Sequence, residues 1–170
     1  MDAVSPKAVS RNRMTVMAVL VCAIMAAGAV AQTTAYYDAQ GRRIGTARVT
    51  GSTTYYYDAI GRRTGSSQTV GSTTVYYDSK GVRVATEHSV GSSRYLYGSK
   101  GTVEERAQQT GRSFSIYDDK GTLVERQQPL QQSTYSYDRV GRLTGRAQPV
   151  SAGDRGTTPT VDFARRLFFD

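Results

Sequence analysis

Residues 55–63 read Tyr-Tyr-Tyr-Asp-Ala-Ile-Gly-Arg-Arg, and this stretch is one copy of a unit that recurs six times along a chain of 170 residues. Tyrosine stands at positions 37, 57, 77, 97, 117 and 137, and glycine at 41, 61, 81, 101, 121 and 141. The spacing is 20 residues each time, without insertion or deletion between copies. A constant period of this length is typical of a repeat architecture, so it determines the fold class.

Each copy has the sequence features of one β-hairpin. From Thr53 to Tyr57 the residues are β-branched or aromatic, the types that strands prefer. Asp58 and Gly61 follow at the first and fourth positions of a turn, as type I turns prefer, and a glycine with positive φ can close the hairpin with a bulge. Arg62 to Gln68 form the predicted return strand. The same turn role is predicted for Asp38, Gly41, Asp58, Gly61, Asp78, Gly81, Gly101, Asp118, Gly121, Asp138 and Gly141.

The six hairpins predict an all-β fold of about 12 antiparallel strands, two to each copy. Open twisted sheets of that size tend to curl, so we expect a curved antiparallel meander or solenoid whose first and last strands leave exposed edges. Side chains alternate between the two faces of a strand, so Tyr57 lies on one face while Tyr36, Tyr56 and Tyr76 lie on the other. The chain is 38% hydrophobic and has no Trp, so its 12 tyrosines are expected to supply much of the buried area.

The N-terminal residues 1–31 have the features of a secretory signal peptide. Basic residues precede an apolar run over residues 15–30, and Ala29-Val30-Ala31 forms a small-residue cleavage site. Cleavage there predicts a mature chain without cysteine or membrane span, located in the periplasm or secreted. An uncleaved N-terminal membrane anchor is the alternative.

The repeat array is expected to occupy residues 32–150, and a linker with a short helix residues 151–170. Thr158 is a predicted N-cap, with Pro159 at the first helical position. Val161, Ala164, Leu167 and Phe168 would then share one face. We expect the helix to cap the open end of the array, as terminal units of solenoids do. A docking tail or a membrane-touching segment is the alternative.

No catalytic constellation is present, so we expect neither enzyme activity nor a cofactor or metal. His88 is the only histidine in the chain, and the pattern contains no metal-ligand motif or phosphate-binding loop. The turn aspartates are explained by the turns themselves.

The net charge of +8 instead favours an anionic partner. We expect a glycan, an anionic cell-surface polymer or an acidic protein face. Nucleic acid is not expected because the chain is predicted to be exported. The candidate binding surface comprises Tyr36, Tyr56, Tyr76, Arg42, Arg43, Arg62, Arg63 and Arg83. In the alternative interpretation these arginines lie over tyrosine rings and pair with the turn aspartates as structural contacts.

The string Tyr-x-Tyr-Asp-x-x-Gly-Arg, which residues 55–62 and 135–142 match fully, resembles the YD repeats of the bacterial Rhs family and the related teneurins. The resemblance covers about 115 residues of this chain, counted on the 20-residue period. It implies strands that spiral into a large hollow shell, which encloses a toxin domain or presents an adhesive surface. Six copies are expected to be too few to close such a shell, and toxin delivery is not expected.

A weaker resemblance is to the 20-residue aromatic hairpin repeats of Gram-positive cell-wall-binding proteins, and a third to MORN-type repeats. The former use tryptophan in their binding pockets, and this chain has none. The resulting function hypothesis is an exported, non-enzymatic repeat module that binds a glycan or protein at the bacterial cell surface or in the periplasm. The alternative is a structural element that self-assembles through its edge strands.

Overall fold

The computed structural model describes residues 32–150 and 162–169 of the chain. These residues form an all-β fold, and the predicted twelve antiparallel strands are confirmed. The predicted signal peptide and the predicted cap at Thr158 and Pro159 lie outside the described residues. The strands are β1 (Gln32–Asp38), β2 (Arg43–Thr50), β3 (Thr53–Asp58), β4 (Arg63–Val70), β5 (Thr73–Asp78), β6 (Arg83–Val90), β7 (Ser93–Gly98), β8 (Val103–Thr110), β9 (Ser113–Asp118), β10 (Leu123–Leu130), β11 (Ser133–Asp138) and β12 (Leu143–Pro149), and they are followed by helix α1 (Phe163–Phe168).

The turn within each repeat is closed by its own aspartate and glycine. In the first copy the Gly41 N–H donates to the Asp38 carbonyl at 3.1 Å, and the Asp38 N–H donates to the Arg42 carbonyl at 2.9 Å. The Asp38 carboxylate also accepts the backbone N–H groups of Gln40 and Arg42 at 3.0 and 2.9 Å. Gly41 has φ +78°, and the strand register shifts between Tyr36 and Tyr37, as expected for a bulged hairpin. Each turn thus depends on local bonds that the repeat motif itself encodes.

The turns between repeats have two central residues. Thr50 pairs with Thr53 across Gly51 and Ser52, and Gly51 has φ +59°. A two-residue hairpin with glycine at the first central position matches a type II′ turn, whose twist suits the flanking strands. Gln131 holds the equivalent position between β10 and β11 with φ +55°, where an L residue with a Cβ is strained.

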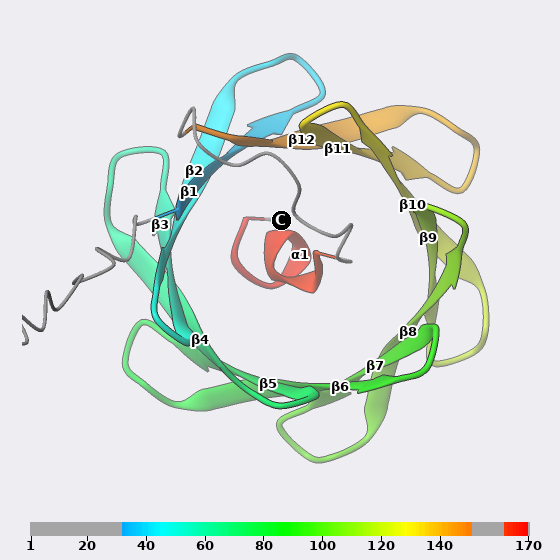
Figure 1. The fold of residues 1–170 in the computed structure, drawn as a ribbon, viewed down its shortest axis with the longest axis horizontal. Helices are drawn as coiled ribbons and strands as arrows, with labels where there is room; N and C mark the ends of the chain where they lie inside the picture. The colour runs from blue at the N-terminus through cyan, green and yellow to red at the C-terminus, as the bar shows by residue number, and fades with distance from the viewer. Residues whose placement is uncertain (1–31, 151–161, 170) are drawn as a thin grey trace, which may run out of the picture.

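The sheet closes on itself, so the predicted open meander or solenoid is wrong. Strand β1 pairs with β12 from Thr34↔Pro149 to Asp38↔Gly145 and with β2 on its other side, giving a closed barrel (Figure 1). Twisted sheets coil, and closure pairs the N–H and C=O groups that an open edge would leave exposed. The edge strands on which the self-assembly hypothesis rested are therefore paired with each other. Six copies suffice for closure because they form a small barrel rather than a large shell.

Helix α1 lies inside the barrel, surrounded by the strands (Figure 1). It begins after Asp162, whose side chain accepts the Arg165 N–H at 3.2 Å as an N-cap. Phe163 and Ala164 are buried, and Leu167 and Phe168 pack against the same core cluster. The expectation of a helix covering an open end is thus corrected: the closed barrel leaves no edge to cap, and the helix fills the interior.

Candidate functional site

The candidate site is the barrel interior together with the helix that occupies it. Eight strands enclose just enough space for their own side chains, so twelve strands leave room for something more. Many inward-facing residues here are small, among them Ala47, Ser67, Ala85 and Ala107, which are all buried. Such a wall cannot fill the interior by itself. Helix α1 supplies the missing side chains, led by Phe163, which has no exposed surface.

One side of the helix packs on the inward-facing tyrosines of the first repeats. The Phe168 ring stacks on Tyr56 with centroids 4.5 Å apart, and the Phe169 ring lies 4.6 Å from that of Tyr36. Gly45 and Gly65 make this approach possible. A Cβ added at Gly45 would collide with the Phe169 ring, and one at Gly65 would collide with the Phe168 ring. These glycines therefore provide the space in which the two aromatic rings sit.

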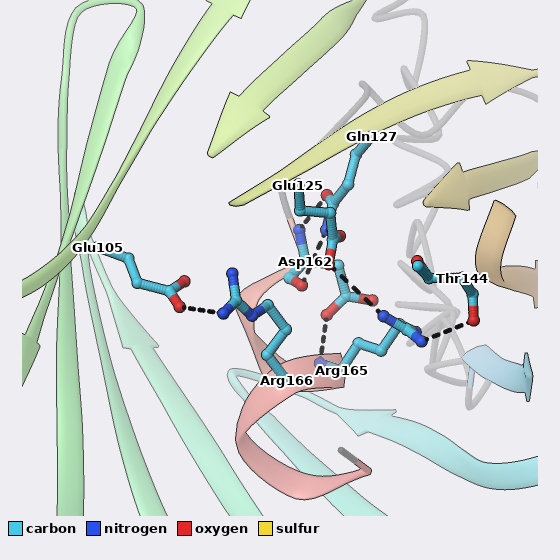
Figure 2. Close-up of polar contacts among 7 residues, drawn as sticks. All are labelled: Glu105, Glu125, Gln127, Thr144, Asp162, Arg165 and Arg166. Atoms are coloured by element: carbon cyan, nitrogen blue, oxygen red, sulfur yellow. Dashed lines mark hydrogen bonds and ion pairs between the residues drawn. The ribbon is translucent and has the colours of Figure 1, made fainter. Parts of the chain in front are cut away.

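Two arginines of the helix meet two glutamates of the barrel wall (Figure 2). The Arg166 guanidinium lies 3.0 Å from the Glu105 carboxylate, and that of Arg165 lies 3.5 Å from Glu125. Arg165 also donates to the Thr144 carbonyl at 3.1 Å. The side chains of Arg165 and Glu125 are each 7% exposed. Removing one partner of so buried a pair leaves an uncompensated charge, so the pair fixes the orientation of the helix.

The N-terminal end of α1 is held by a hydrogen-bonded pair with the wall (Figure 2). The Asp162 N–H donates to the Gln127 side-chain oxygen at 2.8 Å, and the Gln127 amide donates to the Asp162 carbonyl at 3.2 Å. The same Gln127 amide donates to Glu125 at 2.8 Å, so the polar groups of this region are linked.

Burial raises the pKa of the Asp162 carboxyl above its ordinary value, although a hydrogen bond from Tyr36 and the Arg165 N–H oppose the shift. Burial is also the main cause that raises the pKa of the Tyr36 hydroxyl, and the neighbouring Asp162 charge adds to it.

A second buried polar group lies on the wall itself. Glu87 is 4% exposed, and it accepts the Tyr76 hydroxyl at 2.7 Å and the Arg94 guanidinium at 2.8 Å. Burial, followed by the Glu87 charge, raises the pKa of the Tyr76 hydroxyl well above its ordinary value. Glu87 is thus bound by other residues of the barrel wall, whereas Glu105 and Glu125 pair with the helix.

The candidate binding surface predicted from sequence is divided between two places. Tyr36, Tyr56 and Tyr76 are 4–5% exposed and line the interior. Arg42, Arg43, Arg62, Arg63 and Arg83 are exposed at the end of the barrel where the longer turns lie. The two sets therefore do not form one surface, because the strand alternation that groups the tyrosines also turns them inward.

We call this end of the barrel, with its six longer turns, the arginine rim; it comprises residues 38–43, 58–63, 78–83, 98–103, 118–123 and 138–143. Here Arg42 pairs with Asp38 at 2.7 Å. Desolvation acts to raise the pKa of Asp38, but the hydrogen bonds from the Arg42 backbone and side chain, the Arg42 charge and the Gln40 N–H together lower it. Arg63 lies over the Tyr55 ring, 5.1 Å from its centroid. Arg43 donates to the Ala59 carbonyl of the next turn at 3.3 Å. Some of these arginines thus make the structural contacts of the alternative interpretation while their surface remains exposed.

Sequence reasoning did not single out the residues that hold the helix: Glu105, Glu125, Gln127, Asp162, Arg165 and Arg166. Two signals were available in the printed sequence. The return strands carry Gly45 and Gly65 in the early repeats where later ones carry Glu105 and Glu125 in the same column, and the C-terminal segment carries adjacent arginines. Opposite charges in distant segments indicate contact only once the topology is known.

No group suited to a metal ion occurs among residues 32–150 and 162–169. His88 is hydrogen-bonded to the Thr73 hydroxyl at 3.0 Å, and its ring lies edge-on to that of Tyr97. In the same described ranges, no helix is long and apolar enough to cross a membrane.

Comparison with known proteins places these features in a family context. A family model described as Teneurin YD-shell matches residues 12–152, which confirms the resemblance to YD-repeat proteins. An X-ray structure of a protein from Arabidopsis thaliana superposes with a TM-score of 0.51 at 10% sequence identity, over 80% of this chain and 85% of that one. Identity so low supports a likeness of fold alone. None of the curated proteins compared with this sequence gives a significant match.

Proposed function

This chain belongs to the Teneurin YD-shell family, and from that membership we propose that it is an exported, non-enzymatic structural repeat module. In this proposal the barrel holds its own C-terminal helix and presents the arginine rim to a partner. The observation that carries it is the seating of α1 inside the barrel, with Arg165 and Arg166 paired to wall glutamates.

The filled interior favours a structural role over a ligand-binding lumen. Phe163 is fully buried, and burying a phenylalanine side chain contributes about 1.5–3 kcal/mol. The Arg165 and Arg166 side chains of the helix are paired with glutamates of the wall. A barrel filled by its own chain is a rigid body on which exposed turns are displayed.

Hydrogen exchange on the full chain tests this structural role. We expect the amides of α1 to exchange about as slowly as those of the strands, because helix and barrel open together. Exchange of α1 at the rate of an unprotected peptide, with the strands still protected, would contradict the proposed seating of the helix.

The partner is proposed to be an anionic glycan or an acidic protein surface outside the cytoplasm. A groove of about 500 Å³ lies between the first two longer turns, lined by Asp38, Arg42, Arg43, Asp58 and Ile60 among others. An arginine beside an exposed apolar side chain suits a sugar ring that carries an acidic group. A similar groove of about 540 Å³ separates the last two turns, where Arg139, Val140 and Arg142 take part.

Binding to a panel of acidic polysaccharides tests the partner class. The triple variant Arg42→Gln/Arg43→Gln/Arg62→Gln should bind more weakly, and salt should weaken the wild type. Arg48→Gln/Arg112→Gln removes two arginines toward the other end of the barrel and serves as the control. Equal binding by both variants would refute a role for the arginine rim.

A further inference from the structure

The end of the barrel opposite the arginine rim exposes a ring of apolar side chains. Val70, Val90, Leu130 and Val150 occupy one column of the repeat and are 70, 64, 60 and 62% exposed. Each lies at or just beyond the end of a strand, and Val70, Val90 and Leu130 are next to a turn between repeats. We call this end the apolar rim; it comprises residues 50–53, 70–73, 90–93, 110–113 and 130–133 and Val150.

The two rims differ in charge. Arg112 is the only charged residue of the apolar rim, whereas the arginine rim contains ten Lys or Arg and six Asp. The arginine rim also exposes Ile60, Val82, Val103, Val140 and Leu143, but there the apolar side chains are interspersed with many charged ones. Scattered exposed apolar residues are normal, while several gathered on an uncharged face mark an interaction site. The apolar rim therefore has the composition of a docking surface.

The segments that join the barrel here indicate what covers this rim. Strand β1 begins with Gln32, which pairs with Val49 beside the apolar rim, so residues 1–31 join the barrel at this end. That segment contains the uncharged apolar run 15–30. Residues 151–161 join at the same end through Val150, but they are mostly small and polar and include Asp154 and Arg155. They match an apolar ring poorly, whereas the run 15–30, retained as the uncleaved N-terminal anchor of the alternative given above, places the ring beside lipid.

We propose that the apolar rim rests on a lipid bilayer, with Val70, Val90 and Leu130 in the boundary between headgroups and acyl chains. The turn residues between these side chains are glycine, serine and glutamine, whose polar groups remain at headgroup level. Arg112 reaches the lipid phosphates while its stem lies along the apolar surface. The arginine rim then points away from the membrane, toward the partner of the proposed function, although the lipid contact does not depend on that function.

Fluorescence quenching on vesicles tests this orientation with the full chain. Cys22→Ser removes the natural thiol, and Ser72→Cys or Ser79→Cys then places one fluorophore on the apolar rim or the arginine rim. The vesicles contain equal parts of phosphatidylglycerol and phosphatidylcholine with brominated acyl chains. We expect the fluorophore at position 72 to lose most of its emission and that at 79 to keep it. Positions 72 and 79 are roughly 18 Å apart along the barrel axis, because the seven residues between them rise about 3.3 Å each and barrel strands tilt by about 40°.

Two matched variants identify the side chains responsible. Val70→Asp/Val90→Asp/Leu130→Asp should abolish the quenching at position 72 even though residues 15–30 still hold the chain on the vesicle. Ile60→Asp/Val82→Asp/Val140→Asp, at the arginine rim, should leave it unchanged. If the fluorophores at positions 72 and 79 emit equally in proteins without the aspartate substitutions, the proposal is overturned. This comparison does not require the aspartate variants to fold. Light scattering that shows a dimer, with position 72 unquenched, would assign the rim to a second copy of the chain and also overturn it.

Discussion

The position of α1 inside the barrel predicts an energetic coupling between Gly65 and Phe168. A Cβ at Gly65 would collide with the Phe168 ring and would also lie 2.5 Å from the Tyr77 carbonyl oxygen. Gly65→Ala should therefore destabilise the protein through two contacts, one with the helix and one with the neighbouring strand. Only the first contact disappears when Phe168 is replaced by alanine.

The expected magnitudes follow from these contacts. Overpacking of this kind costs about 1–3 kcal/mol, so we expect about 2 kcal/mol for Gly65→Ala alone. Phe168 is partly buried and stacked on Tyr56, so Phe168→Ala should cost about 2–3 kcal/mol, below the range for a fully buried phenylalanine. In the double variant the collision with the ring is relieved. The double variant should therefore be more stable than the sum of the single effects by about 1 kcal/mol.

Urea unfolding of the four proteins, followed by circular dichroism, measures this cycle. A difference of about 1 kcal/mol corresponds to roughly 2–4 °C in Tm for a chain of this size, so thermal unfolding gives a second readout. Ala85 occupies the same column in the third repeat and already carries a Cβ. Ala85→Gly combined with Phe168→Ala is the control pair, for which we expect additive effects. If the Gly65 and Phe168 substitutions are also additive, the ring does not lie over Gly65 and the described packing is wrong.

Three further predictions concern strain, protonation and charge. Gln131→Gly should raise stability by about 1 kcal/mol because it relieves a positive φ, and Gly51→Gln should lower it similarly; equal thermal stability of all three proteins would contradict this. Because burial raises the pKa of Asp162, its carboxylate binds a proton more tightly in the folded than in the unfolded protein. The free energy of unfolding should therefore gain a contribution from Asp162 as the pH falls from neutral toward 3.8, the ordinary pKa of the group. Asp162→Asn should remove this contribution. The prediction would be refuted if the unfolding curves of the wild type and of Asp162→Asn shifted equally with pH. Glu125→Gln should cost about 3 kcal/mol by leaving Arg165 without its buried counter-ion, and Glu125→Gln/Arg165→Gln should cost less than the sum of the single variants in denaturant titrations.

The hairpins could be predicted because their determinants are local. Asp58 and Gly61 specify a turn whose hydrogen bonds stay within a few residues, and the alternation at Tyr56 and Tyr57 follows from strand geometry. The column containing Tyr56 was placed correctly on the opposite face from Tyr57. The alternation of side chains does not show which face of the strand turns inward, since the columns of Tyr56 and Tyr57 are both aromatic.

Closure could not be predicted from the repeat, since it depends on the sum of small twists over all twelve strands. Each copy is compatible with either an open or a closed sheet, and the pairing of Thr34 with Pro149 joins residues that are far apart in sequence. The expectation of exposed edge strands was wrong for this reason: it treated the first and last strands as ends, whereas they are neighbours.

Closure around a helix also explains why the repeats diverge along the chain. A ring of six identical copies would present the same side chain on all sides, but α1 carries an aromatic ring that packs on one strand and arginines that pair with others. The inward column that begins with Gly45 and Gly65 makes room for rings, and its continuation at Glu105 and Glu125 supplies counter-ions. Glycine at 45 and 65 and glutamate at 105 and 125 thus let a barrel of similar repeats hold an asymmetric helix in one orientation. It follows that exchanging the Gly65 and Glu125 side chains would place a carboxylate against Phe168 and deprive Arg165 of its partner, without altering the turns that form the barrel.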